Sequence, residues 1–121
     1  MQPKKIIEDV VERPWGRYKK IFQEPGVWVK RVEVNRGARL SLQKHAKRSE
    51  KWIIVKGHGL AIVNQHEIAI EPWMVVDVPL GAIHRIGNTG DDSLIFIEVA
   101  CGSYLGEDDI TRLEDDYNRK Q

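Results

Sequence analysis

The sequence lacks several features that would each point to a particular class of protein. It contains one cysteine, Cys101, so it can form no internal disulfide, and a small disulfide-stabilised secreted scaffold is excluded. It has no apolar run long enough to cross a membrane as a helix. The N-terminal stretch has no apolar segment followed by a small-residue cleavage site. We therefore expect no secretory signal peptide and a cytoplasmic location.

The composition is typical of one globular domain spanning residues 1–121. The chain is 41% hydrophobic and 31% charged, with a net charge of +1. Residues 1–56 carry fifteen Lys/Arg against six Asp/Glu, whereas residues 57–121 carry four against twelve. The basic residues of the first half alternate with apolar ones, as solvent-facing positions of strands do. This pattern favours a pocket for a small anion over a nucleic-acid surface, and we expect neither a nucleic-acid nor a membrane partner.

Short alternating runs separated by turn signals indicate an all-β sandwich or barrel. No segment before residue 105 has a useful helical period, and a charged loop is expected over residues 46–51. We expect the domain core to cover about residues 12–105. The turn sequences are Pro25-Gly26, Asn35-Arg36-Gly37, Gly57-His58-Gly59, Pro79-Leu80-Gly81 and Asn88-Thr89-Gly90-Asp91.

The C-terminal segment has a different pattern. Ile110, Leu113 and Tyr117 lie at i, i+3 and i+7 and would form one apolar stripe of a helix. Acidic residues precede the stripe, where the positive end of a helix dipole would favour them. The pattern predicts a short amphipathic helix over about residues 107–119, packed on the outside of the barrel.

The segment from residue 39 to residue 45 is the strongest indication of a site. In a strand, Arg39, Ser41, Gln43 and His45 share one face, because side chains alternate between faces. The intervening leucines face the other way and suit a core. Inside a small barrel, the polar face would be a binding site.

Two further residues complete a candidate set of metal ligands. Glu50 follows His45 across the charged loop, and His84 follows the turn Pro79-Leu80-Gly81, which can aim it at the interior. Together with Gln43 they form a mixed nitrogen and oxygen set without a thiolate. Such a set suits Zn²⁺, Mn²⁺, Fe²⁺, Co²⁺ or Ni²⁺. We predict that Gln43, His45, Glu50 and His84 bind one divalent cation, with zinc as the first expectation.

Two spaced motifs resemble those of the cupin family. Gly37-x5-Gln43-x-His45-x4-Glu50-x6-Gly57 resembles the first cupin motif, with Gln where many cupins have the first His. Pro79-x-Gly81-x2-His84-x3-Asn88 resembles the second motif at each fixed position. The resemblance implies a double-stranded β-helix, the cupin jelly roll.

Within the cupins, the chain is similar to the C-terminal domain of the bifunctional mannose-1-phosphate guanylyltransferase/mannose-6-phosphate isomerases. The similarity extends from about residue 12 to about residue 119, without the guanylyltransferase half. It implies a metal-dependent interconversion of mannose 6-phosphate and fructose 6-phosphate through an enediol, in nucleotide-sugar and polysaccharide biosynthesis. The segments that carry it are Arg13-Pro14-Trp15-Gly16, Gly37-Ala38-Arg39-Leu40-Ser41-Leu42-Gln43, Gly102-Ser103-Tyr104-Leu105-Gly106-Glu107-Asp108-Asp109-Ile110 and Glu114-Asp115-Asp116-Tyr117.

The sequence departs from this family in the loop between the first ligands. The family has a stretch resembling Met-His-His-His-Arg-Ala-Glu-His-Trp where this chain has Lys44-His45-Ala46-Lys47-Arg48-Ser49-Glu50-Lys51-Trp52. One family histidine is thus alanine here and two are lysine. Two functions follow: an isomerase, which the retained ligands and Arg48 favour, or a non-catalytic module that binds a sugar phosphate, which the altered loop favours. A metal-dependent oxygenase is a weaker third hypothesis, since such cupins use more histidine ligands.

The isomerase hypothesis assigns roles to particular residues. Arg39, Ser41, Lys47 and Arg48 are the candidates for binding the sugar phosphate. Arg48 is also a candidate catalytic residue, and the candidates for proton transfer are Glu50, Asp77 and Lys51. Finally, the segment before Trp15 has nothing of its own to pack against, and we predict a homodimer to whose interface this segment contributes.

Overall fold

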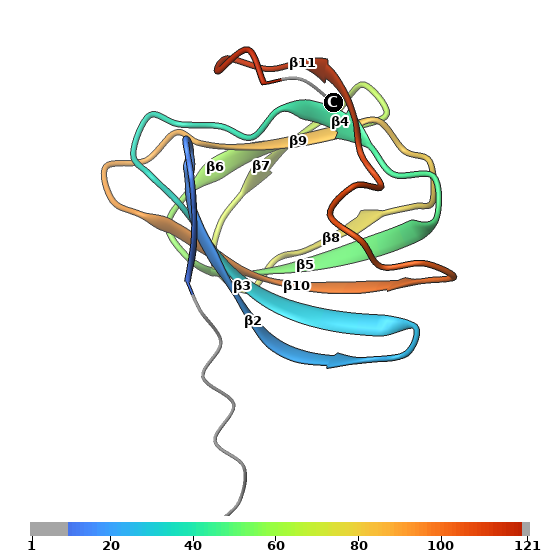
Figure 1. Ribbon diagram of the computed structural model, residues 1–121. Coiled ribbons are helices and arrows are strands. Elements are labelled where there is room, and N and C mark those ends of the chain that lie inside the picture. The colour runs from blue at the N-terminus through green and yellow to red at the C-terminus, as the bar shows by residue number, and fades with distance from the viewer. Residues whose placement is uncertain (1–9, 120–121) are drawn as a thin grey trace, which may run out of the picture.

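The computed structural model describes residues 10–119, which form two antiparallel β-sheets and contain no helix (Figure 1). One sheet has the strand order β1-β2-β3-β10-β5-β8 and the other β11-β4-β9-β6-β7. The strands are β1 (Val11–Arg13), β2 (Gly16–Glu24), β3 (Val27–Val34), β4 (Leu42–Lys44), β5 (Arg48–Lys56), β6 (Gly59–Val63), β7 (His66–Ile70), β8 (Val75–Val78), β9 (His84–Asn88), β10 (Leu94–Gly102) and β11 (Thr111–Glu114). The all-β jelly roll expected from the sequence is confirmed.

The central strands of the larger sheet are apolar at one end and charged at the other. In β3 the inward residues run from Lys30 to Val32 and Val34, and in β10 they run from Glu98 to Phe96 and Leu94. The antiparallel register places Lys30 opposite Glu98 and Val32 opposite Phe96. Strand β5 follows the same pattern, with Glu50 and Arg48 at the charged end. The barrel interior is therefore divided into an apolar core and a polar half.

The apolar half holds the fold together. Its fully buried side chains include Phe96, Ile54, Ile86 and Leu94, contributed by both sheets. Trp52 lies at the boundary, where its ring packs 5.4 Å from the ring of Phe96 and its indole N–H faces the polar half. Burial of this apolar surface supplies most of the stabilisation. The polar residues of the other half are therefore not needed for most of the stability and can form a functional site.

The expected C-terminal helix is wrong. Residues 111–114 form the strand β11 instead, which pairs with the edge of β4 through Thr111↔Lys44 and Arg112↔Gln43. The open edge of β4 offers backbone hydrogen bonds that only an extended strand can accept and donate. This pairing outweighs the helical spacing of the apolar residues in the segment. Leu113 is consequently exposed, whereas Tyr117 packs against the core.

Two further expectations concern the charged loop over residues 46–51 and the N-terminal segment. The charged loop is shorter than expected, because β5 already begins at Arg48. Most of the N-terminal segment to which a role in dimerisation was assigned, residues 1–9, lies outside the described residues. Within the described range, no helix is long and apolar enough to cross a membrane.

Candidate metal centre and cavity

Three of the four predicted ligands meet inside the barrel. His45 follows β4, Glu50 lies in β5 and His84 begins β9, and one donor atom from each lies within 4.8 Å of the others. All three side chains are buried. His45 Nε2 is 3.2 Å from Glu50 Oε2, and the two imidazole rings lie 4.9 Å apart. The structure thus brings together residues that come from both sheets.

In both histidines, a hydrogen bond at Nδ1 fixes the ring and leaves Nε2 as the atom that can coordinate a metal. His45 Nδ1 lies 2.7 Å from the carbonyl oxygen of Asp109, and His84 Nδ1 lies 2.9 Å from that of Ala82. A carbonyl oxygen only accepts, so each Nδ1 carries a proton, and the neutral form of each ring has its lone pair on Nε2. Burial lowers the pKa of His84, which favours its neutral form. Neutral imidazoles fixed by a second hydrogen bond are suited to bind a cation.

The carboxylate of Glu50 is held from two sides. Its Oε1 accepts a hydrogen bond of 2.9 Å from Trp52 Nε1, and its Oε2 accepts one of 2.9 Å from Arg48 Nε. Burial by itself would raise the pKa of Glu50, but hydrogen bonding to His45 and the positive charges around it hold that pKa below its usual range. Glu50 is therefore ionised, as a metal ligand requires.

Gln43 adjoins this cluster through the sheet register. It lies opposite His84 in the β4–β9 pair, and its side chain is buried against the cavity. The amide nitrogen donates to Ser41 Oγ at 2.9 Å, so the amide oxygen is the atom that can act as a ligand. With Gln43, the four predicted residues provide two imidazole nitrogens and two types of oxygen. This donor set fits a divalent cation.

Arg48 lies against the cluster rather than in an exposed loop. Its guanidinium is buried, donates to Glu50 Oε2, and places Nη2 3.2 Å from His45 Nε2. It also stacks over the ring of Trp28, with 4.8 Å from Cζ to the ring centroid. Arg48 therefore supplies a fixed positive charge beside the candidate ligands.

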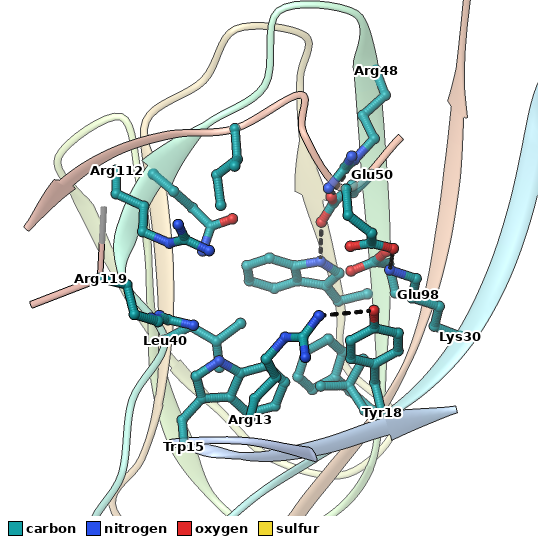
Figure 2. Close-up of a pocket in the computed structure, with 16 residues that line it drawn as sticks. Arg13, Trp15, Tyr18, Lys30, Leu40, Arg48, Glu50, Glu98, Arg112 and Arg119 are labelled. Carbon is teal, nitrogen blue, oxygen red and sulfur yellow. Dashed lines mark hydrogen bonds and ion pairs between the residues drawn. The ribbon is translucent and has the colours of Figure 1, made fainter. Parts of the chain in front are cut away.

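The cluster adjoins a cavity in the polar half of the barrel. Figure 2 shows Glu50, Glu98 and Lys30 on one side of the cavity and Arg112 and Arg119 on the other. The walls also include Trp15, Tyr18, Leu40 and Gln43. Lys30 is buried between the rings of Tyr18 and Trp28, and its Nζ forms an ion pair of 2.6 Å with Glu107. The cavity thus has carboxyl groups and cations on one side and the arginines of the C-terminal segment on the other.

Glu98 is a functional candidate that the sequence analysis missed. Its carboxyl is buried at the cavity wall, and its Oε2 accepts a hydrogen bond of 2.8 Å from Trp28 Nε1. Burial and then the negative charge of Glu50 raise the pKa of Glu98 to about 8. Among the described residues Glu98 forms no ion pair. The sequence does contain a pattern that indicates Glu98 as a candidate. This charged residue stands between Phe96 and Ala100, at a strand position that alternation assigns to the interior.

The structure does not bring Asp77 and Lys51 to the cavity. They form an ion pair with each other on the outer face, where their side chains are 68% and 65% exposed. Alternation explains this placement, since Val76 and Val78 point inward and Asp77 must point outward. Neither residue is in a position to exchange a proton with a molecule bound inside the barrel.

Two of the predicted phosphate ligands also lie outside. Arg39 is exposed and forms a bidentate ion pair with Asp116, because the segment before β4 forms only an isolated bridge at Arg39 and the strand alternation does not extend back to it. Lys47 is exposed and lies over the ring of Tyr104. Ser41 is buried beside Gln43, as the alternation predicts.

Comparison with known proteins identifies the family of this chain. The family model described as mannose-6-phosphate isomerase C-terminal matches residues 2–115. The chain belongs to this family. It is 45% identical over 109 residues to the xanthan biosynthesis protein XanB of Xanthomonas campestris pv. campestris and 43% identical over 109 residues to the alginate biosynthesis protein AlgA of Pseudomonas aeruginosa. Each match covers 90% of this chain and 23% of the relative, so the chain spans about a quarter of the length of these proteins.

Solved structures with the same fold are more distant in sequence. The capsular polysaccharide assembling protein CapF of Staphylococcus aureus superposes with a TM-score of 0.80 at 21% identity, over 91% of this chain and 35% of CapF. A cupin domain of Schizosaccharomyces pombe Cnp3 superposes with a TM-score of 0.66 at 23% identity, over 71% of this chain and 64% of that domain. At these identities the likeness shows the cupin fold alone.

Proposed function

We propose that this protein is a metal-dependent aldose–ketose isomerase that interconverts mannose 6-phosphate and fructose 6-phosphate. One observation carries the proposal: Glu50 belongs both to the buried cluster with His45 and His84 and to the wall of a cavity that Gln43, Glu98 and several arginines also line. The family membership supports the sugar phosphate as substrate, and the biosynthetic names of XanB and AlgA support a role in supplying polysaccharide precursors.

Gln43, His45, Glu50 and His84 would hold the cation, for which zinc is our first proposal and Mn²⁺, Co²⁺, Fe²⁺ and Ni²⁺ are alternatives. When bound, a divalent cation stabilises negative charge on the oxygens of the substrate. Arg48 adds its positive charge on the same side of the cavity. The residues of this wall therefore bind the end of the sugar where the double bond shifts.

The altered histidine-rich loop does not argue against catalysis. The three positions at which family histidines are replaced are Ala46, Lys47 and Lys51, and all three residues are exposed. The retained residues Arg48 and Glu50 are the ones that point inward. Replacement of the three histidines thus leaves the cavity wall unchanged, which favours the isomerase over the non-catalytic binding module.

Glu98 is our proposal for the group that moves the proton. As carboxylate it takes the proton from C2 of the open-chain aldose; the electron pair of that C–H bond forms the C1–C2 double bond, and the π pair of the C1 carbonyl moves to O1, which takes a proton from solvent. As carboxylic acid it then returns the proton to C1, while the hydroxyl on C2 gives its proton back to solvent and C2 becomes the carbonyl carbon of the ketose. Its hydrogen bond from Trp28 holds the carboxyl at the wall. A buried carboxyl with a pKa near the working pH suits both steps.

A coupled assay of fructose 6-phosphate formation tests the proposal, with Zn²⁺, Mn²⁺, Co²⁺, Fe²⁺ and Ni²⁺ added in turn to protein stripped of metal. We expect turnover with at least one of these ions. Absence of turnover with every ion, together with a rise in melting temperature on addition of mannose 6-phosphate, would replace the isomerase by the binding module. The cytoplasmic location inferred from the sequence is part of this proposal, since the substrates of such a pathway are phosphorylated intracellular sugars.

A further inference from the structure

Three arginines from the two ends of the described chain line the cavity. Arg13 ends β1, Arg112 lies in β11, and Arg119 follows β11 near the C-terminus. All three line the cavity, and Figure 2 shows Arg112 and Arg119 on its far side, with Arg13 reaching across toward Tyr18. Residues about one hundred positions apart in the sequence thus contribute guanidinium groups to one cavity.

These arginines bring like charges to one cavity. Burial and then the positive charge of Arg119 lower the pKa of Arg112, whereas the negative charge of Asp115 raises it. Like charges brought together inside a barrel cost free energy, and an anion bound among them removes that cost. The arrangement is therefore typical of a site that is completed by a negatively charged ligand.

Arg119 and Arg13 are each held in position by neighbouring groups. Asp115 accepts hydrogen bonds from Arg119 Nε at 2.9 Å and from Nη2 at 3.0 Å. Arg13 donates to the backbone carbonyl of Glu12 and to the hydroxyl of Tyr18, and it pairs with no carboxylate among residues 10–119. The acidic residues of the cavity lie on the other wall, where Glu50 and Glu107 are paired with Arg48 and Lys30. The charge of Arg13 is thus available to a ligand.

The order of groups across the cavity, with Glu50 and Glu98 on one side and Arg112 and Arg119 on the other, is the order that a hexose 6-phosphate needs. The reacting carbons C1 and C2 are at one end of such a molecule and the phosphate is at the other. With C1 and C2 at Glu50 and Glu98, the phosphate would extend toward the arginine wall. A guanidinium donates two parallel hydrogen bonds to a phosphate, so three of them can surround a dianion.

We propose that Arg13, Arg112 and Arg119 form the subsite that binds the phosphate group of the sugar phosphate. The identity of the sugar in this inference rests on the proposed function, whereas the recognition of a phosphate group does not. It replaces the site expected from the sequence, because Arg39 and Lys47 lie outside the barrel. It also explains why β11 pairs with β4, since this pairing carries Arg112 to the cavity.

The test compares the variants Arg13→Gln, Arg112→Gln and Arg13→Lys with the wild type in the full chain. Isothermal titration calorimetry measures binding of mannose 6-phosphate, inorganic phosphate and unphosphorylated mannose, and the coupled assay measures KM and kcat. We expect each glutamine variant to weaken binding of both phosphate-containing ligands about tenfold or more, as loss of a charged hydrogen bond does, with binding of mannose unchanged. Arg13→Lys should recover part of the affinity. Lys44→Gln, which removes an exposed cation from β4, is the matched control and should bind like the wild type.

The outcomes separate this inference from the proposed function. If the wild type turns over mannose 6-phosphate and Arg13→Gln retains its KM, the phosphate subsite is wrong while the isomerase stands. If no metal supports turnover but Arg13→Gln loses phosphate binding, the subsite stands and the isomerase is wrong. A loss of affinity in Arg39→Gln instead would place the phosphate outside the barrel and overturn the inference. Melting temperatures and metal content establish that each variant is folded, and Arg13→Gln decides the test if Arg112→Gln does not fold.

Discussion

The guanidinium of Arg48 and the carboxylate of Glu50 are joined inside the barrel by a hydrogen bond of 2.9 Å from Nε to Oε2. The same guanidinium reaches His45 Nε2, so one arginine contacts two of the candidate metal ligands. Arg48 therefore has two effects: it holds Glu50 in the orientation that faces the cavity, and its positive charge opposes that of a bound cation. Substitution of Arg48 separates these effects.

We expect Arg48→Ala to lower kcat/KM at least tenfold, about 1.4 kcal/mol of transition-state stabilisation, because a fixed positive charge near the reacting oxygens is lost. Metal content should be at least as high as in the wild type, since the change removes a competing cation from the cluster. The coupled assay and elemental analysis of the same preparation measure both quantities. A fall in metal content that accounts for the lost activity would show that Arg48 acts only through the position of Glu50.

Metal binding itself depends on the two buried histidines. We expect His45→Ala and His84→Ala to contain little or no metal after purification without chelator, because each removes one of few ligands. His66→Ala is the matched control, since His66 is exposed on β7 and is separated from His84 by strand β6, and it should retain the wild-type content. Equal metal in all four proteins would exclude the predicted site.

Proton transfer is expected to depend on Glu98 and not on Asp77. Glu98→Gln keeps the size of the side chain and an oxygen that can accept from Trp28 Nε1, so the fold and sugar-phosphate binding should persist. Turnover should fall by about a hundredfold or more, which is the usual contribution of a general base. Asp77→Asn, on the outer face, should keep the wild-type kcat. The opposite result would return the role of base to Asp77.

The ion pair between Asp115 and Arg119 predicts a dependence of stability on pH. The hydrogen bonds from Arg119 lower the pKa of Asp115 from 3.8 to about 2. Because the folded state has the lower pKa, the stabilisation is fully present above the unfolded pKa and is lost as the pH falls through 4 toward 2. Chemical denaturation of the wild type and of Asp115→Asn at pH 7, 4 and 3 measures this contribution. The variant should be less stable at pH 7, and the difference should shrink at pH 3.

The outer face of the larger sheet supports the predicted homodimer. Val55 and Val75 are 51% and 57% exposed there, and Val75 lies opposite Ile53 in the β5–β8 pair. Exposed apolar side chains on a sheet face, here beside the ion pair of Lys51 and Asp77, can be buried when two copies associate. We expect a dimer at micromolar concentration by sedimentation, and Val75→Glu should shift the protein toward the monomer. Leu113→Glu, at an exposed apolar position of β11 in the other sheet, is the control and should remain dimeric. A monomeric wild type would contradict the prediction.

The sequence alone determined the strands, the fold family and the candidate ligands. Strand alternation has a period of two, so it places Ser41, Gln43 and His45 on one face and Leu40 and Leu42 on the other without knowledge of the partner strands. The motif spacing then identified His45 and His84 as a pair before their contact was known. These features depend on neighbouring residues or on fixed spacings, and they can therefore be recognised in the linear sequence.

Only the tertiary structure decided which charged residues face the cavity. Arg39 and Lys47 resemble phosphate ligands in the sequence, but the chain leaves the strand geometry near them and both lie outside. Arg13 and Arg112 carry no local signal, because their position depends on the pairing of β1 with β2 and of β11 with β4. The C-terminal segment has a helical period and yet forms a strand, because the open edge of β4 satisfies its backbone. Which charged residues face the cavity thus depends on contacts between segments that are distant in the sequence, and no local sequence pattern encodes those contacts.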